Sequence, residues 1–342
     1  MKNKLTIGIA IIVLIVAIIG YSFYSKIYSP NVPETTSILI PTGTDFESLI
    51  RIIEPRVNNL NDFIWVAKKK NYPNKIRAGK FRITKGMNND ELVNHLRGGK
   101  QETITLTFNN QDSFEKLAGR IAVQIEADSL SLLNIFKNEA FMKLNGFDSN
   151  TALAMYIPNS YDFYWNTNAI QFQDKMLKEY NSFWNESRMQ KAKEQNITPL
   201  QVATLASIVQ KETAVVGERK TVAGLYLNRL HDFWPLQADP TIIFALKQKY
   251  GQDKEFKRVL NKDLKIDSPY NTYSNFGLPP GPIGMPDISS IEAVLNPEEH
   301  QYYYMCANVE NIGYHKFAKT LKEHNINAAA YQKWVSQQGI KR

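Results

Sequence analysis

The chain has 342 residues, of which 43% are hydrophobic and 22% are charged, so it is long enough for two or three globular domains. Its 41 Lys and Arg residues against 33 Asp and Glu residues give a net charge of +8, which favours anionic partners without choosing among them. The absence of a long Lys or Arg run argues against nucleic acid. One Cys excludes an internal disulfide, and the five scattered His lack metal-ligand spacing, so we expect no metal and no cofactor.

The N-terminus predicts a membrane anchor. Leu5–Tyr24 carries no charge, is dense in aliphatic residues and is long enough to span a bilayer. A cleaved signal peptide is the alternative, but its apolar region is usually shorter, and this run ends in aromatic residues typical of a membrane interface. Lys2 and Lys4 favour a cytoplasmic N-terminus, weakly opposed by Lys26. We therefore expect residues 1–24 to be a cytoplasmic tip and a single anchor, with the rest of the chain exported.

Residues 25–37 contain two Pro and predict a short linker after the anchor. A strand-like run, a turn and a helix start then follow one another three times, beginning at Ile38, Phe81 and Ile104. The first two predict a compact βααβ binding module at residues 38–100, and the third leads into the next domain. Whether the three form a true repeat stays open, because strand, turn and helix often occur in this order.

A helix beginning after Thr198 carries the most informative residue. Thr198 is a suitable N-cap, Pro199 suits the first helical position, and Gln201 can close a capping box. Apolar residues then recur at helical spacing, and Glu212 continues their stripe. A carboxylate on the core-facing side is costly to ionise, so Glu212 is either paired with a cation such as Lys211 or kept as an acid of raised pKa.

Three polar or rigid loops follow this helix: Leu236–Thr241, Ser268–Asn275 and Gly277–Pro286. The first places an amide and a carboxylate beside a Pro that fixes the backbone. The third is so rich in Pro and Gly that it cannot be regular structure, and a rigid loop suits a preorganised site. A structural turn or a polyproline linker is the alternative for the third loop.

Taken in order, these stretches resemble the YceG-like family, the membrane-anchored endolytic murein transglycosylases of the MltG type. The matching motifs are Ala206–Thr213, Asn228–Leu230, Leu236–Thr241, Tyr270–Tyr273 and Gly277–Ile283, followed by a closing segment with Asn296-Pro297, Tyr302–Tyr304, Gly313–Phe317 and His324-Asn325. Two departures stand out: Gln210 lies where an acidic residue is expected, and Tyr314–Phe317 varies the usual pattern.

The resemblance implies cleavage of the peptidoglycan glycan strand between MurNAc and GlcNAc, leaving a 1,6-anhydro-MurNAc end, with Glu212 as general acid and then base. One carboxylic acid suffices because the nucleophile is the substrate's own C6 hydroxyl. The side chains expected to bind the substrate are Gln237, Asp239, Asn271, Tyr273 and Asn275.

Three acidic or basic residues keep open roles at this stage. Asp239 either binds the substrate or fixes its own loop. Glu218 is read as a first-turn helix residue or an ion-pair partner, and His315 as a packed or hydrogen-bonded residue rather than a participant in the reaction.

The implied architecture is an α+β protein with an N-terminal transmembrane helix, a small LysM-like module at 38–100 and a mixed α+β lytic transglycosylase domain at 101–342. Its place is the bacterial inner (plasma) membrane, its partners are peptidoglycan strands and the bilayer, and peptidoglycan synthases remain an open possibility. The family limits glycan strand length during growth. The alternatives are a non-catalytic wall-binding scaffold of the synthesis machinery and a hydrolase that uses water.

Overall fold

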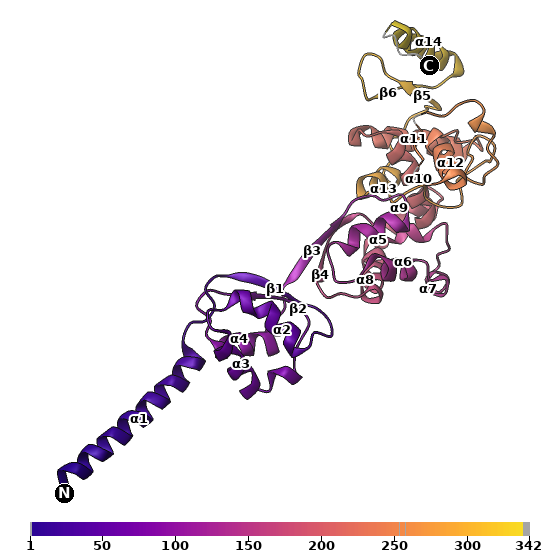
Figure 1. The fold of residues 1–342 in the computed structure, drawn as a ribbon. Coiled ribbons are helices and arrows are strands. Elements are labelled where there is room, and N and C mark those ends of the chain that lie inside the picture. The colour runs from indigo at the N-terminus through magenta and orange to yellow at the C-terminus, as the bar shows by residue number, and fades with distance from the viewer. Residues whose placement is uncertain (1, 253, 257, 338–342) are drawn as a thin grey trace. The chain divides into compact units, whose positions relative to one another are not determined.

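The structure, a computed structural model, describes residues 2–252, 254–256 and 258–337 (Figure 1). Among these residues, helices predominate and the strands form three two-stranded sheets. The predicted α+β class is therefore confirmed.

The chain divides into two compact units. The first comprises Met1–Leu106 with two short later segments, Ala122–Ala127 and Tyr161–Asn168, and the second comprises the remainder. Tyr161–Asn168 joins the first unit because β3 (Thr103–Phe108) pairs with β4 (Asn159–Tyr164). Ala122–Ala127 joins it through Glu126, whose backbone N–H donates to the Trp165 carbonyl oxygen and whose carboxylate accepts from Thr42. The predicted boundary after residue 100 lies just before β3, and the units part within that strand.

The first unit begins with one long apolar helix. Its remaining elements follow in the predicted βααβ order, with one further helix: α1 (Lys2–Tyr28), β1 (Thr36–Ile40), α2 (Phe46–Ile53), the 3₁₀ turn η1 (Glu54–Arg56), α3 (Leu60–Lys69), the 3₁₀ turn η2 (Tyr72–Asn74), β2 (Gly79–Ile83) and α4 (Asn89–Gly98). β1 and β2 are antiparallel, with Thr36 opposite Ile83 and Ile40 opposite Gly79. The likeness of this module to LysM stays a prediction.

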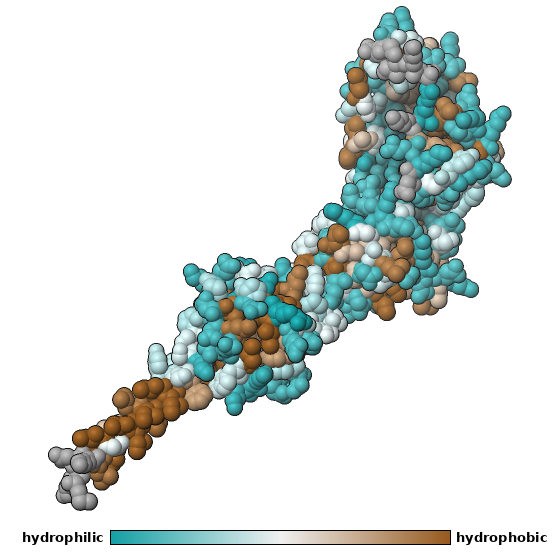
Figure 2. All heavy atoms as spheres, in the orientation of Figure 1, coloured by the Kyte–Doolittle hydropathy of each residue, from teal (hydrophilic) through white to brown (hydrophobic). Residues whose placement is uncertain are grey.

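α1 has the properties of the predicted anchor. Its segment Leu5–Tyr28 is 24 residues long and apolar enough to cross a membrane. Figure 2 shows the apolar residues of this helix lying on its surface, where a soluble helix would have polar ones. The helix therefore fits a single-pass membrane protein.

The segment expected to be a linker is folded with the module. The buried Asn31 side chain donates to the Asn59 carbonyl oxygen at 3.0 Å and to Asn89 Oδ1 at 2.7 Å, and it accepts from the Asn59 backbone at 2.7 Å. Val32 is 2% exposed and lies in the module's core. Because Asn31 supplies hydrogen bonds in place of regular structure, residues 29–35 are held against the module without a helix or strand of their own.

The second unit is mainly helical. Its elements are α5 (Phe114–Ala122), α6 (Ser129–Phe136), α7 (Glu139–Leu144), η3 (Ala152–Met155), α8 (Ala169–Phe183), α9 (Glu186–Glu194), α10 (Pro199–Glu212), η4 (Val216–Glu218), α11 (Arg219–His231), α12 (Asp239–Tyr250), η5 (Asp263–Lys265), α13 (Ile288–Leu295), β5 (Tyr304–Ala307), β6 (His315–Ala318) and α14 (Leu321–Gln337). β5 and β6 form an antiparallel pair that α14 contacts.

α10 lies at the centre of this unit, in contact with α9, α11, α12 and α13 (Figure 1). Its residues 202–209 are all buried, so the helix is enclosed on every side instead of presenting the single apolar face that its spacing suggested. The two hydroxyls in this stretch are satisfied within the helix, since Thr204 donates to the Leu200 carbonyl and Ser207 to the Thr204 carbonyl. A helix fixed in this way gives its C-terminal residue, Glu212, a rigid support.

Candidate functional site

The start of α10 forms as its sequence predicts. Thr198 Oγ1 accepts from the Gln201 backbone N–H at 3.3 Å, and Gln201 Oε1 accepts from the Thr198 backbone N–H at 2.8 Å. This reciprocal capping box, with Pro199 after it, sets the first turn of the helix. The register of the buried residues then brings Glu212 to the edge of the core.

Glu212 is a half-buried acid, and it is not paired with the neighbouring lysine. The Lys211 ammonium group instead binds Asp112 Oδ1 at 2.7 Å. The partner of Glu212 is the hydroxyl of Tyr226, a buried residue of α11, which donates to Glu212 Oε1 at 2.7 Å. Of the two states that the sequence left open, the structure therefore favours the acid.

The surroundings of Glu212 hold it near its titration point at neutral pH. Burial raises the pKa of its carboxyl to about 7. The hydrogen bond from Tyr226 is the strongest opposing influence, followed by the interaction with His315. The carboxylate of Asp239 adds to the rise. A carboxyl with this pKa can both give and take a proton near pH 7, which is the requirement for general acid–base catalysis.

Tyr226 and Arg229 are one helical turn apart on α11, so they lie on the same side of that helix. The guanidinium of Arg229 is buried and donates to the Tyr303 carbonyl oxygen from Nε at 2.8 Å and from Nη2 at 2.5 Å, and to the Leu236 carbonyl oxygen from Nη1. It thus ties the closing segment of the chain to the first loop. Its charge also acts to lower the pKa of Glu212.

The first loop has an unusual backbone at Gln237, where φ is +51°. A non-glycine residue in the left-handed region is uncommon and often marks a functional position. The Gln237 backbone N–H donates to the Thr272 carbonyl oxygen at 3.0 Å, and the Ala238 N–H donates to Thr272 Oγ1 at 3.0 Å. These two bonds tie the first loop to the second through Thr272, and the Gln237 side chain is left exposed.

Asp239 and Tyr273 are brought together beside Glu212. Asp239 is the first residue of α12 and is exposed, and the Tyr273 hydroxyl donates to its Oδ1 at 2.6 Å. Burial and this bond raise the pKa of Tyr273, so its hydroxyl keeps its proton. Asp239 therefore has a side-chain partner from the second loop, and its negative charge raises the pKa of Glu212.

The two asparagines of the second loop are engaged with its backbone. Asn271 is fully buried, and its Nδ2 donates to the carbonyl oxygens of Leu264 at 3.0 Å and Ile266 at 2.8 Å, while its Oδ1 accepts from the Tyr273 N–H at 3.0 Å. Asn275 is exposed, and its Nδ2 donates to two carbonyl oxygens of the same loop. In this geometry Asn271 shapes the loop that carries Tyr273, and its direct contact with a substrate stays a prediction.

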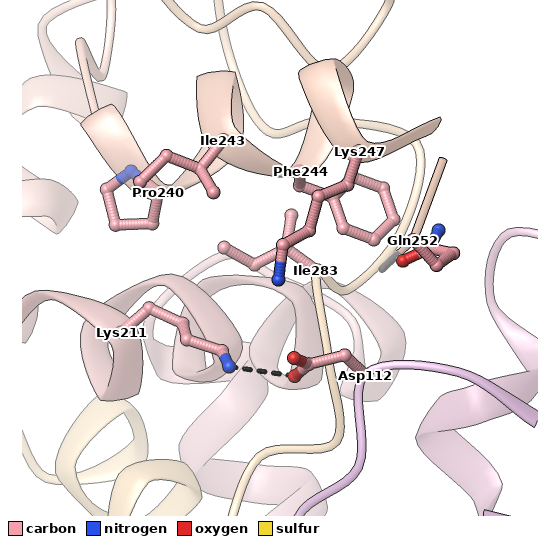
Figure 3. Close-up of a pocket in the computed structure, with 8 residues that line it drawn as sticks. All are labelled: Asp112, Lys211, Pro240, Ile243, Phe244, Lys247, Gln252 and Ile283. Atoms are coloured by element: carbon pink, nitrogen blue, oxygen red, sulfur yellow. Dashed lines mark hydrogen bonds and ion pairs between the residues drawn. The ribbon is translucent and has the colours of Figure 1, made fainter. Parts of the chain in front are cut away.

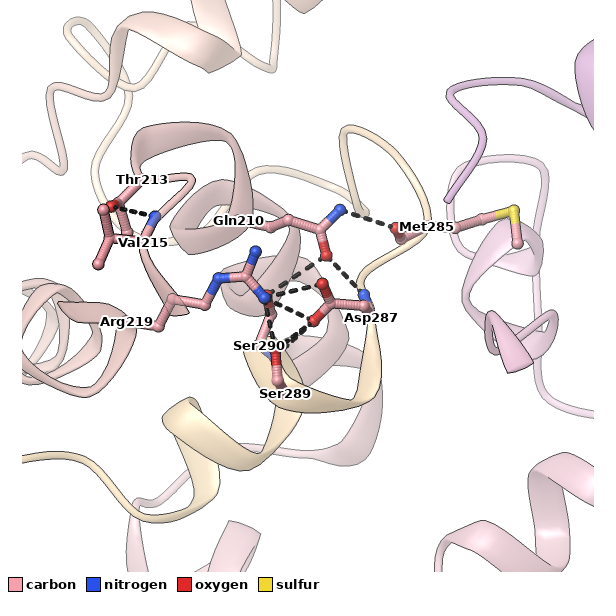
Figure 4. Close-up of polar contacts among 8 residues, drawn as sticks. All are labelled: Gln210, Thr213, Val215, Arg219, Met285, Asp287, Ser289 and Ser290. Carbon is pink, nitrogen blue, oxygen red and sulfur yellow. Dashed lines mark hydrogen bonds and ion pairs between the residues drawn. The ribbon is translucent and has the colours of Figure 1, made fainter. Parts of the chain in front are cut away.

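Gln210, where an acid was expected, fastens the third loop to α10 (Figure 4). Its Oε1 accepts from the Asp287 backbone N–H at 2.6 Å, and its Nε2 lies 3.4 Å from the Met285 carbonyl oxygen, toward which it donates. The Asp287 carboxylate in turn binds Arg219 Nη1 at 2.7 and 2.8 Å. A carboxylate at position 210 could not donate to the loop and would add a second negative charge beside Asp287, so the amide suits this chain's contacts.

Glu218 and His315 are partners of each other. The Glu218 side chain is buried and accepts from the His315 backbone N–H at 2.6 Å, and its other oxygen lies 2.8 Å from His315 Nδ1. This pair attaches β6 to the turn between α10 and α11. Glu218 and His315 are thus hydrogen-bonded partners. Among the described residues, no group of three or more His, Cys, Asp or Glu could hold a metal ion.

Sequence reasoning missed Tyr226 and Arg229 as members of the site. Tyr226 follows the apolar spacing of α11, which indicates packing alone, and nothing local shows that its hydroxyl meets Glu212. Arg229 lies inside a motif that was recognised, but its buried position is set by the fold. The available signal was their spacing of three residues on one helix.

Comparisons with known proteins identify the family of the chain. A model of the YceG-like family matches residues 38–330. The chain is 30% identical over 327 residues to the endolytic murein transglycosylase of Bacillus subtilis (strain 168), covering 90% of this chain and 87% of that protein. It is 27% identical over a 348-residue alignment to the endolytic murein transglycosylase of Streptococcus pneumoniae serotype 2 (strain D39 / NCTC 7466), covering 91% of this chain and 62% of that protein.

A solved structure is similar as well. The crystal structure of a YceG-like protein from Listeria monocytogenes aligns with a TM-score of 0.57 at 29% sequence identity, over 86% of this chain and 98% of that one. The resemblance seen in the motifs is confirmed.

Proposed function

This chain belongs to the YceG-like family, and from that premise we propose that it is an endolytic murein transglycosylase. It cuts the glycan strand of peptidoglycan between MurNAc and GlcNAc and leaves a 1,6-anhydro-MurNAc end. The observation that carries the proposal is Glu212, a half-buried acid whose pKa is raised to about 7 and whose side-chain partner is the Tyr226 hydroxyl. The names of the relatives support the same substrate.

The reaction needs one carboxyl group. In the first step Glu212 gives its proton to the glycosidic oxygen as the bond from MurNAc C1 to that oxygen breaks, and the bond's electron pair leaves with the oxygen. In the second step the Glu212 carboxylate takes the proton of the MurNAc C6 hydroxyl, and the C6 oxygen forms the new bond to C1. The acid is restored and no water is consumed, because the substrate supplies its own nucleophile.

The neighbours of Glu212 have separate parts in this mechanism. The Tyr226 hydroxyl holds Oε1, so the other carboxyl oxygen is the one that exchanges the proton. Asp239, oriented by Tyr273, offers negative charge where positive charge develops on the sugar ring. The exposed Gln237 side chain binds a sugar substituent, and Asn271 and Asn275 act by holding the loop that presents Tyr273.

The N-terminal helix supports a membrane location for this activity. α1 acts as a single-pass anchor in the bacterial plasma membrane, with its N-terminus in the cytoplasm and the catalytic unit outside. The end of α1 is attached to the module that follows it, because the Asn89 side chain donates to the Lys26 carbonyl oxygen at 2.8 Å and Val32 lies in the module's core. We propose that such an enzyme acts on newly made strands and limits their length, which makes peptidoglycan synthases candidate partners.

Two other functions fit parts of the structure. Asp239 supplies a second carboxylate close enough to affect the pKa of Glu212, and a hydrolase would use such a pair, one carboxyl as acid and the other as base or nucleophile. A wall-binding scaffold would use the small module at 38–100 and the Tyr302–Tyr304 region as contact surfaces and would perform no chemistry.

The deciding experiment incubates the full-length protein in detergent, wild type beside Glu212→Gln, with purified peptidoglycan. Anhydro ends released by the wild type and absent with the variant support the transglycosylase. Reducing MurNAc ends favour the hydrolase, and wall binding without cleavage by either protein favours the scaffold.

A further inference from the structure

A separate pocket of about 120 Å³ opens between α10, α12 and the third loop (Figure 3). Its apolar surface comes from Ile243 and Phe244 of α12 and from Ile283 of the loop. The loop is fixed at this point, because the Ile283 N–H donates to Ser207 Oγ of α10 at 3.0 Å. A pocket of this size can take a small side chain with a polar group.

The charged groups of the pocket are two lysines and one aspartate. Lys211 and Asp112 neutralise each other at 2.7 Å. Lys247 is half-buried, and Figure 3 shows it reaching from α12 with its ammonium group directed toward Ile283. Within the part of the chain that the structure describes, no carboxylate lies within ion-pair distance of Lys247. The pocket therefore combines an apolar wall with one cation available to a ligand.

The position of the pocket relates it to the acid. Lys211 is the residue before Glu212, and Pro240 is the residue after Asp239, so the pocket begins one residue from each carboxylate of the candidate site. Neighbouring Cα atoms are about 3.8 Å apart, so the pocket lies close along the chain to both carboxylates.

We propose that this pocket is a subsite for the acidic stem peptide of peptidoglycan, a proposal that rests on the function given above. MurNAc is cut at C1 and carries its peptide through a lactyl group at C3 of the same ring, so the peptide starts a few bonds from the scission point. Its first residue is a small apolar alanine and its second bears a carboxylate. The alanine methyl packs on Phe244 and Ile283, and the carboxylate binds Lys247.

The test compares glycan strands that carry stem peptides with the same strands stripped of peptides by an amidase. The full-length enzyme in detergent is assayed as wild type, Lys247→Gln and Lys249→Gln, and the measured quantity is the ratio of kcat/KM on the two substrates. Lys249 is the matched control, because it lies on the same helix, is exposed and does not line the pocket. We expect Lys247→Gln to lower the ratio about fivefold, the effect of one partly exposed ion pair, and Lys249→Gln to keep it.

Two outcomes overturn the subsite while leaving the proposed function intact. One is equal cleavage of both substrates by the wild type, and the other is an equal fall of the ratio in both variants. If the wild type cleaves neither substrate, the proposed function fails, and binding of the synthetic peptide L-Ala-γ-D-Glu-L-Lys-D-Ala-D-Ala then tests the pocket by itself. Calorimetry should show weaker binding to Lys247→Gln than to Lys249→Gln, and equal binding contradicts the subsite.

Discussion

Replacing Tyr226 by Phe tests how the structure tunes its acid. The change removes the hydroxyl that donates to Glu212 Oε1 at 2.7 Å and keeps the ring, which is 1% exposed. The hydrogen bond favours the carboxylate over the neutral acid, so its loss raises the pKa of Glu212 above about 7. Because the first step needs the protonated acid, the alkaline limb of the rate profile should move to higher pH.

The size of the shift follows from the strength of the bond. A hydrogen bond to a charged group contributes about 1.5–3 kcal/mol, and one pKa unit corresponds to about 1.4 kcal/mol. The neutral acid also accepts from the hydroxyl, so only part of this energy separates the two states, and we expect a shift of about one unit. At pH 8 the protonated fraction then rises from about a tenth to about a half, while a less well-oriented carboxyl lowers the plateau.

The assay measures kcat/KM on purified peptidoglycan between about pH 5 and pH 9, since this quantity reports the pKa values of the free enzyme. Tyr250→Phe serves as the control, because Tyr250 is an exposed tyrosine of α12 and should leave the profile in place. An alkaline limb that stays fixed in Tyr226→Phe, or that moves to lower pH, would refute this account of the acid.

Three further predictions concern the same unit. Asp239→Asn removes a charge that raises the pKa of Glu212, so the alkaline limb should move to lower pH, and an upward shift in the same pH series would count against it. Glu212→Gln should stabilise the fold by about 1–3 kcal/mol at pH 8 and not at pH 4. The pKa of Glu212 rises from 4.5 to about 7 on folding, so the wild-type protein loses folding free energy as the pH rises through that window. Thermal unfolding at both pH values checks this, and equal differences would contradict it. Gln210→Glu adds negative charge beside Asp287 and should lower Tm by several degrees at pH 8. The decrease in Tm should be smaller at low pH, where the new carboxyl is protonated.

The parts of the fold that the sequence predicted are those fixed by local chemistry. The capping box at Thr198 and Gln201 uses only neighbouring residues, so their identities suffice to place the start of α10. The apolar run of α1 is likewise visible without any tertiary contact. Residues 25–37 were expected to be a linker because they contain Pro and lack periodicity. Their attachment rests on the buried Asn31 side chain and on backbone hydrogen bonds to Gly86 and Met87, and contacts between such distant segments have no local signal.

The candidate site shows the same division. Glu212 was found because its position continued the spacing of a helix, whereas Tyr226 and Arg229 were missed because their contacts join segments far apart in the chain. Asn271 was expected among the substrate-binding residues because its loop matches a motif of the family. In the fold those groups serve the loop's own backbone, which has few regular hydrogen bonds.

The central claim is that the strand is cut without water. The most direct test is to find which oxygen forms the new bond to MurNAc C1, the C6 hydroxyl oxygen or the oxygen of water. Purified peptidoglycan is digested by the full-length enzyme in water enriched in oxygen-18, and the masses of the new MurNAc ends are measured by mass spectrometry. Glu212→Gln is the control for background cleavage. The account predicts ends that are one water lighter than reducing MurNAc and that carry no label. Reducing ends that contain oxygen-18 would contradict it, because they would show that water, and not the C6 hydroxyl, attacks C1.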